Sequence, residues 1–176
     1  MRSSERPWSV PIAANEVPET GRHFDLVADA QARAAIARLA GVSAVPRLTA
    51  SFDVTRHSRG GLRVVGQVSG TVGQTCVVTL EPMENTVEES IDVVFTPGAA
   101  APRETAQVEV PLEDAPEAMS DGTVDLGALA TEFLILGINP YPRKPGAVFQ
   151  SSAAEDDAAR PFAALAALKK RTGDGR

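Results

Sequence analysis

Few residues in this chain have side chains that could support chemistry, and they are widely spaced. The 176 residues include one cysteine, Cys76, and two histidines, His23 and His57. A structural zinc site normally takes four cysteine or histidine ligands, often entering as Cys-x-x-Cys, and here Thr79 stands three positions after the cysteine. Neither histidine lies in a His-x-x-x-His or His-Glu-x-x-His pattern. The sequence therefore predicts no metal site and no cofactor.

The usual catalytic motifs are missing from the sequence. There is no Gly-x-Ser-x-Gly elbow, no P-loop and no Gly-x-Gly-x-x-Gly. Spacing alone does not test a triad assembled from residues that are distant in the sequence. We expect a protein that is not an enzyme and that has no catalytic residue. We interpret Cys76 as a small buried side chain on the apolar face of a strand that also carries Val78 and Leu80.

Charge is the second chemical signal. The net charge is −6, which on average repels polyanions. Residues 47–72 nevertheless carry four arginines and one aspartate, a net charge of +3, whereas residues 73–120 carry ten acids and one arginine, a net charge of −9. Such asymmetry is typical either of a polarised binding surface or of a solvated acidic face.

Two basic segments are candidates for contact with RNA, because phosphates are bound by cations held on one surface. They are the predicted hairpin over residues 47–63 and the C-terminal tail. Aromatic residues make up only 5% of the chain, so we do not expect base stacking on exposed aromatic rings. The candidate RNA-contact residues are Arg47, Arg56, His57, Arg59, Arg63, Lys169, Lys170 and Arg171.

The alternation of apolar and polar residues predicts a β-rich middle. We expect strands over 47–55, 62–72, 76–80 and 87–95, with turns at 58–61 and 82–85. Short turns between consecutive strands favour an antiparallel meander. Gly66 and Gly70 within one strand predict a bend or bulge and a strongly curved sheet. The segment 7–28 is expected to be irregular or strand-like, with burial at Val10, Ile12, Phe24, Leu26 and Val27.

Two helices are expected beside this sheet. The first covers 30–40, between the N-cap Asp29 and the C-cap Gly41. The second begins at the N-cap Asp125 and ends at Gly137, and the proline-rich NPYPRKPG follows it. The predicted fold is α+β: a curved antiparallel meander, partly open and barrel-like, with two flanking helices. A further short strand is expected at Val108 and Val110.

The last residues are expected to form a separate unit. We divide the chain into a domain over 1–150 and a tail over 151–176, in which a flexible linker precedes a short helix that begins at Pro161. That helix could dock in a groove of a partner or fold back on its own domain. No apolar run is long enough to span a membrane, the N-terminus is not a secretory signal, and a single cysteine fits a reducing cytosol. We therefore expect a cytoplasmic location.

Three segments, in this order, resemble the YceD family of large ribosomal RNA subunit accumulation proteins. They are the strand ending at Cys76 with TLEPM after it, VDLGALATEFLILGINPYPRKPG at 124–146, and RPFAALAALKKR at 160–171. The resemblance covers roughly residues 20–171. Many family members carry Cys-x-x-Cys at the first segment, where this chain has Thr79 in the second position. The positions that match the family motifs are Cys76, Asp125, Leu126, Glu132, Pro142, Arg143, Pro161, Phe162, Leu165, Leu168 and Lys169.

The resemblance implies a role in accumulation of large-subunit ribosomal RNA and in ribosome biogenesis. The expected partner is that rRNA or a pre-ribosomal particle, with a ribosomal protein as a further partner and no membrane contact. The alternative is an acidic adaptor or chaperone that binds a basic ribosomal protein without touching RNA, which the net charge of −6 favours.

Overall fold

The computed structural model describes residues 6–97, 116–119 and 121–149. The strand expected at Val108 and Val110 and the helix expected after Pro161 lie outside these residues, so the division of the chain at residue 150 stays a prediction. No helix in the described part is long and apolar enough to cross a bilayer.

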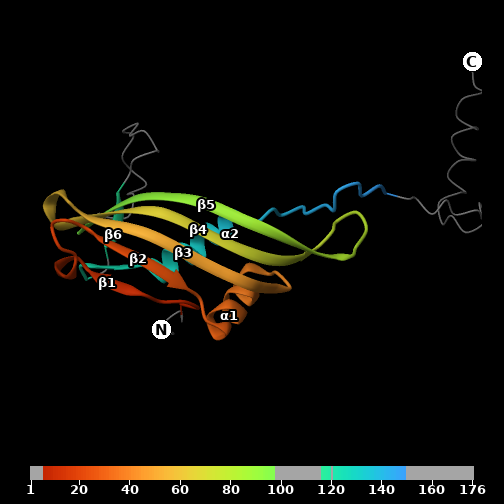
Figure 1. Cartoon of the computed structure of the whole chain (residues 1–176), viewed down its shortest axis with the longest axis horizontal. Coiled ribbons are helices and arrows are strands. Elements are labelled where there is room, and N and C mark those ends of the chain that lie inside the picture. Colours follow the sequence, from red (N-terminus) through yellow and green to blue (C-terminus); the bar gives the residue numbers. More distant parts are fainter. Residues whose placement is uncertain (1–5, 98–115, 120, 150–176) are drawn as a thin grey trace, which may run out of the picture.

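A curved five-stranded sheet forms the body of the protein, in the order β2-β3-β4-β5-β6 (Figure 1). Its strands are β2 (Arg22–Val27), β3 (Ala44–His57), β4 (Gly61–Thr75), β5 (Pro82–Pro97) and β6 (Glu117–Met119). All neighbours are antiparallel except β5 and β6, which are parallel. Two short strands, β1 (Pro11–Ala13) and β7 (Thr123–Asp125), form a second sheet. Short 3₁₀ turns lie at Ala14–Glu16 and Ser58–Gly60. The predicted α+β class and the open, curved meander are confirmed.

Both predicted helices are confirmed. Their boundaries are set by local capping. Helix α1 (Ala30–Ala40) begins where the Asp29 carboxylate accepts a hydrogen bond from the Ala32 amide over 2.7 Å, and it ends at Gly41 in the left-handed conformation. Helix α2 (Leu126–Leu136) begins where the Asp125 carboxylate accepts from the Ala128 amide over 3.1 Å.

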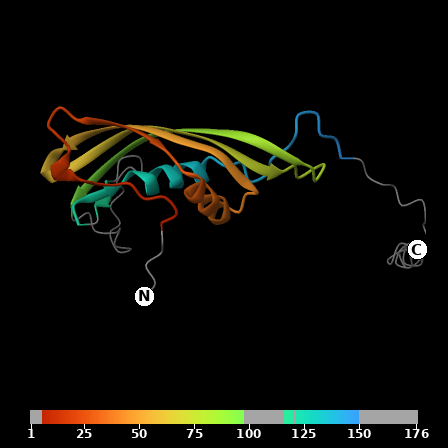
Figure 2. The same cartoon turned by 60° about the horizontal axis from the view of Figure 1, so that its bottom comes forward.

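One face of the sheet is covered and the other is open. Helices α1 and α2 and the N-terminal segment lie on the same side of the sheet (Figure 2). The core lies between them and contains fully buried side chains such as Phe52, Leu62, Ile91 and Leu134. Ile12 is buried as expected, but Val27 is 74% exposed because it points to the open face of β2.

The predicted strand over 76–80 and the predicted turn over 82–85 are both wrong. Strand β4 ends at Thr75, the turn covers residues 76–81, and β5 starts at Pro82, so β4 and β5 pair without interruption from Leu62↔Phe95 to Thr75↔Pro82. Leu80, expected on a buried face, has a φ of 57° and is 76% exposed. Its amide donates to the Cys76 carbonyl over 2.9 Å and closes the turn.

Gly66 and Gly70, where a bend or bulge is predicted, form no bulge, although the sheet is curved as expected. Pairing runs regularly past both glycines, and the register shift lies between Ala44 and Arg47 instead. A Cβ atom at Gly70 would stand 2.6 Å from Cδ1 of Leu134, whereas one at Gly66 would collide with the backbone carbonyl of Ser51 and stand 2.8 Å from Cδ1 of Phe52. Gly70 therefore gives room to α2, and Gly66 allows the backbone of β3 and the Phe52 ring to approach closely.

Candidate interaction site at the tip of the β4–β5 hairpin

Two segments that are distant in the sequence dock together at the tip of the β4–β5 hairpin. The loop after α2, residues 139–147, lies against the turn over 76–81. The Val77 amide donates to the Pro142 carbonyl over 2.9 Å, and the Gln74 side chain donates to the Asn139 carbonyl over 2.8 Å. The Lys144 ammonium forms an ion pair with Glu81 at 2.8 Å. We call this pair of segments the tip.

Cys76 is the buried centre of the tip. Its Sγ accepts hydrogen bonds from the Thr79 amide at 3.5 Å and from the Lys144 amide at 3.4 Å. Hydrogen bonds from the Thr79 side chain and from backbone amides, the Lys144 amide first among them, lower the pKa of the thiol to about 6. Cys76 is buried as expected, but it lies in a turn and accepts hydrogen bonds through its sulfur. In the described part of the chain, no group of three or more histidine, cysteine and acidic side chains could hold a metal ion.

The outer surface of the tip carries an aromatic ring beside a cation. Tyr141 is 71% exposed, and Arg143, two residues further on, is exposed as well. Val77 and Leu80 add exposed apolar surface from the turn. Sequence reasoning missed Tyr141, although its position between Pro140 and Pro142 is a signal for an exposed loop.

Three arginine side chains at this end of the molecule are available to a ligand. The guanidinium groups of Arg38, Arg47 and Arg143 form no hydrogen bond or ion pair with other residues that the structure describes. Arg38 lies in the last turn of α1, and Arg47 pairs with Thr71 near the end of β4. The Ser43 amide donates to the Gly73 carbonyl over 2.9 Å, which joins the segment between these two arginines to the tip end of β4.

The structure splits the basic hairpin that the sequence predicts. Arg47 and Arg63 share the open face of the sheet, but Arg47 lies at the tip end. Arg56 lies nine residues further along β3 from Arg47, which is about 30 Å at the usual rise of an extended chain. Arg63 binds Asp92 through two hydrogen bonds of 2.9 and 2.6 Å, and Arg56 Nε donates to the Val17 carbonyl over 2.6 Å. His57 is exposed at the opposite end, and the side chain of Arg59 lies outside the described set.

A polar cluster on the open face has the residue types of a catalytic triad. His23 Nδ1 lies 2.7 Å from Asp53, and its Nε2 lies 3.3 Å from both Ser51 Oγ and Asp25. Hydrogen bonds to Asp53 and then to Asp25 raise the pKa of His23, because both carboxylates stabilise the charged ring. The cluster lies on exposed strands, and none of its members lines the clefts beside α1 and α2. The geometry therefore favours a surface ion-pair cluster.

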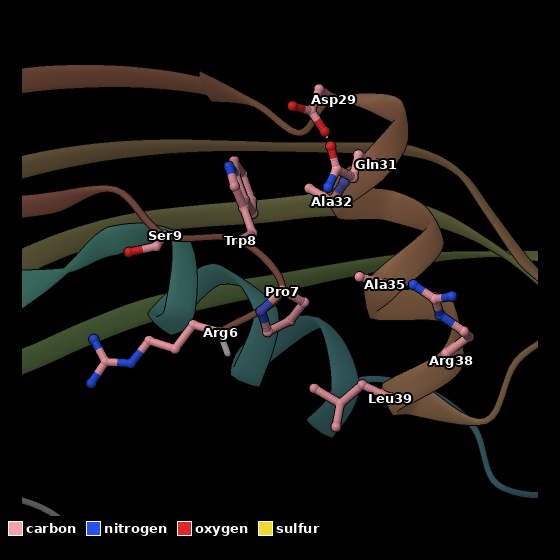
Figure 3. A pocket seen from close by; sticks show the side chains of 10 residues that line it. All are labelled: Arg6, Pro7, Trp8, Ser9, Asp29, Gln31, Ala32, Ala35, Arg38 and Leu39. Atoms are coloured by element: carbon pink, nitrogen blue, oxygen red, sulfur yellow. The ribbon is translucent and has the colours of Figure 1, made fainter. Parts of the chain in front are cut away.

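A cleft of about 530 Å³ lies between the N-terminal segment and α1 (Figure 3). Trp8 projects into it from the N-terminal segment, and Gln31 and Arg38 line it from the helix. Arg6, at its other end, forms an ion pair with Asp125 at 2.9 Å. Trp8 and Arg38 therefore line the same cleft from opposite sides, and sequence reasoning missed Trp8 as a candidate.

The residues at family-motif positions divide between structural and exposed roles. The Asp125 carboxylate also accepts from Ser9 Oγ at 2.7 Å and from the Val10 amide at 2.8 Å, so it holds the N-terminal segment against α2. Leu126 and Pro142 are buried, whereas Glu132 and Arg143 are exposed. Those in the tail, Pro161, Phe162, Leu165, Leu168 and Lys169, lie outside the described residues together with Lys170 and Arg171.

The fold and the tip define an α+β protein whose notable surface is an exposed platform at one end of an open sheet. The family model described as large ribosomal RNA subunit accumulation protein YceD matches residues 64–169. The chain belongs to this family. The family's name indicates a role in the accumulation of large-subunit ribosomal RNA. No curated protein and no solved structure matches the chain. The match includes both segments of the tip and begins just after Arg63.

Proposed function

We propose that this chain is a non-enzymatic, cytoplasmic factor that binds large-subunit ribosomal RNA, or a pre-ribosomal particle that contains it, through the tip. The observation that carries the proposal is the exposed ring of Tyr141 and the exposed side chain of Arg143, two residues apart on a loop held to the hairpin turn by hydrogen bonds. Single-stranded RNA is bound by aromatic rings that stack on bases and by cations that contact phosphates.

The docked loop makes this surface rigid before a ligand arrives. Residues 139–144 are held through main-chain and side-chain contacts to Gln74, Cys76, Val77 and Glu81. A ring on a fixed platform loses little conformational freedom on binding. Arg47 and Arg38, at the same end of the molecule, supply further positive charge for the backbone of an RNA strand.

The test is binding of the full chain to labelled transcripts that tile the large-subunit rRNA. Tyr141→Ala removes one stacking platform and should weaken binding by about tenfold, from the usual energy of one base–aromatic stack. Tyr141→Phe keeps the ring and should bind like the wild type. Arg143→Glu should weaken binding and reduce the dependence of log K on log salt concentration.

A charge reversal of Arg56, Arg59 and Arg63 tests the opposite end of the sheet in the same assay. A large loss in that variant, with undiminished binding by Tyr141→Ala and Arg143→Glu, would move the RNA surface away from the tip. Circular dichroism of each variant controls for loss of the fold.

The second candidate function is an acidic adaptor for a basic ribosomal protein without RNA contact. It is supported by the net charge of −9 over residues 73–120. Recovery of ribosomal proteins with the tagged chain before and after nuclease treatment separates the two functions, because an RNA-mediated complex is lost on digestion.

A further inference from the structure

Strand β5 has a long outer edge that no described strand covers. On its inner side, β5 pairs with β4 from Pro82 to Phe95. On its outer side, β6 pairs only with Phe95, Thr96 and Pro97. Within the described residues, the outer edge over 82–94 has no strand partner, and Figure 1 shows β5 as the border of the sheet along this length. The open edge is about 40 Å long at the usual rise of a β-strand.

An open edge is a template for another extended chain. Alternate residues of an edge strand direct their amide and carbonyl groups away from the sheet, where they can form the ladder of an added strand. The fourteen uninterrupted pairs with β4 keep β5 extended. No backbone rearrangement of β5 is therefore required before a partner strand adds.

The side chains along this edge are acidic. Glu84 and Glu88 point to the open face, with Thr86 and Ser90 at the intervening positions of that face, and Glu89 points to the other side. Glu84, Glu88 and Glu89 form no ion pair with other residues of the described part, whereas Asp92 is bound to Arg63. The apolar side chains of this strand, such as Val87 and Ile91, are buried in the core. The edge therefore presents backbone hydrogen-bonding groups and negative charge.

These properties distinguish among the possible occupants. A second copy that added antiparallel to β5 would bring two acidic edges together, and like charges on paired strands are destabilising. RNA would meet the same negative charge. A polypeptide with lysine or arginine at alternate positions matches both the ladder and the charge.

We propose that the β5 edge binds an extended, lysine- or arginine-rich polypeptide segment by strand addition. Residues of β5 from Met83 to Val94 form the ladder, and Glu84 and Glu88 face cations on the added strand. This surface is separate from the exposed ring of Tyr141, so the proposal does not rest on RNA binding at the tip.

The probe is a synthetic peptide of alternating lysine and threonine, titrated into the full chain. We expect slower hydrogen exchange at alternate amides between Met83 and Val94. Glu88→Lys should weaken binding by about fivefold, because one cross-strand attraction becomes a repulsion. Glu19→Lys is the matched control, since it makes the same change in net charge at an exposed position outside the sheet, and it should bind like the wild type.

Three results would overturn the assignment. The first is equal weakening by Glu88→Lys and Glu19→Lys, which would indicate attraction to net charge alone. The second is equal binding of a control peptide with proline in place of threonine, which cannot donate at those positions. The third is slower hydrogen exchange of the β5 edge amides on self-association, or with an rRNA transcript, but not with the peptide. Tyr141→Ala should leave peptide binding unchanged, so failure at the tip and failure at the edge are distinguishable.

Discussion

The backbone amide of Lys144 donates a hydrogen bond to Sγ of Cys76 across 3.4 Å, between residues that are 68 positions apart. This contact joins the hairpin turn to the loop after α2. The two segments match the family model as distant parts of the sequence, and in the fold they are one unit. The exposed position of Tyr141 depends on that docking.

The first prediction concerns the ionisation of Cys76. Thr79→Val removes the largest cause of the lowered pKa, so the pKa of the thiol should move from about 6 toward its ordinary value. Because the chain has one cysteine, thiolate absorbance followed against pH measures this group alone. The Cys76→Ser variant supplies the baseline, and an unchanged titration in Thr79→Val would contradict the assigned cause.

The same shift has a consequence for stability. The thiol has a lower pKa in the folded chain than in the unfolded chain, so the unfolded state binds more protons between these two values. The contribution is fully present above the ordinary thiol pKa and is lost as the pH falls through about 6. Urea unfolding of the wild type against Cys76→Ser over this range should show the difference.

The second prediction concerns Asp125, which connects three parts of the molecule. Burial raises the pKa of its carboxyl, but hydrogen bonds from Ser9, Val10, Ala128 and Arg6 outweigh burial and hold the pKa below its usual range. Asp125→Ala should lower the free energy of unfolding by about 2 kcal/mol, because it removes a helix cap and leaves a partly buried amide without a partner.

Asp29→Ala is the control for that measurement. Asp29 also caps a helix, but among the described residues its carboxylate accepts a hydrogen bond only from the Ala32 amide. We expect a smaller loss, about 1 kcal/mol, in the same chemical denaturation experiment. Equal losses in the two variants would show that the contacts of Asp125 to the N-terminal segment add nothing to stability.

The third prediction concerns the contact between Gly70 and Leu134. A Cβ atom at residue 70 would collide with a buried methyl group of α2, so Gly70→Ala should cost about 1–3 kcal/mol of stability. Adding Leu134→Val withdraws that methyl group, and the double variant should lose less than the sum of the single losses. Additive losses would mean that α2 does not pack on the sheet at this point.

Sequence reasoning succeeded where structure is determined locally. The caps Asp29, Gly41 and Asp125 act within one turn of their helices, and their types and positions are readable directly. It failed between residues 76 and 85, because the alternation of Cys76, Val78 and Leu80 fits a strand or a turn equally well. The long pairing of β4 with β5 decides between them, and pairing is a property of the whole sheet.

The candidate site could be predicted only in part from the sequence, for the same reason. Arg47 and Arg56 are close in sequence, but an extended strand carries them to opposite ends of the molecule. Lys144 and Cys76 are far apart in sequence and meet through docking of two loops, and Tyr141 lies on one of these loops. Contacts of this kind leave no periodic pattern from which they could be predicted.

The pairing of β1 with β7 has a consequence for the order in which the chain can fold during its synthesis. Strands β3, β4 and β5 are neighbours in sequence, so their hairpins close short loops and can form as soon as residue 97 has emerged from the ribosome. Ile12 finds its partner only at Val124, which closes a loop of more than a hundred residues. Strand β1 therefore stays unpaired while most of the protein is made, and the covered face of the sheet is sealed last.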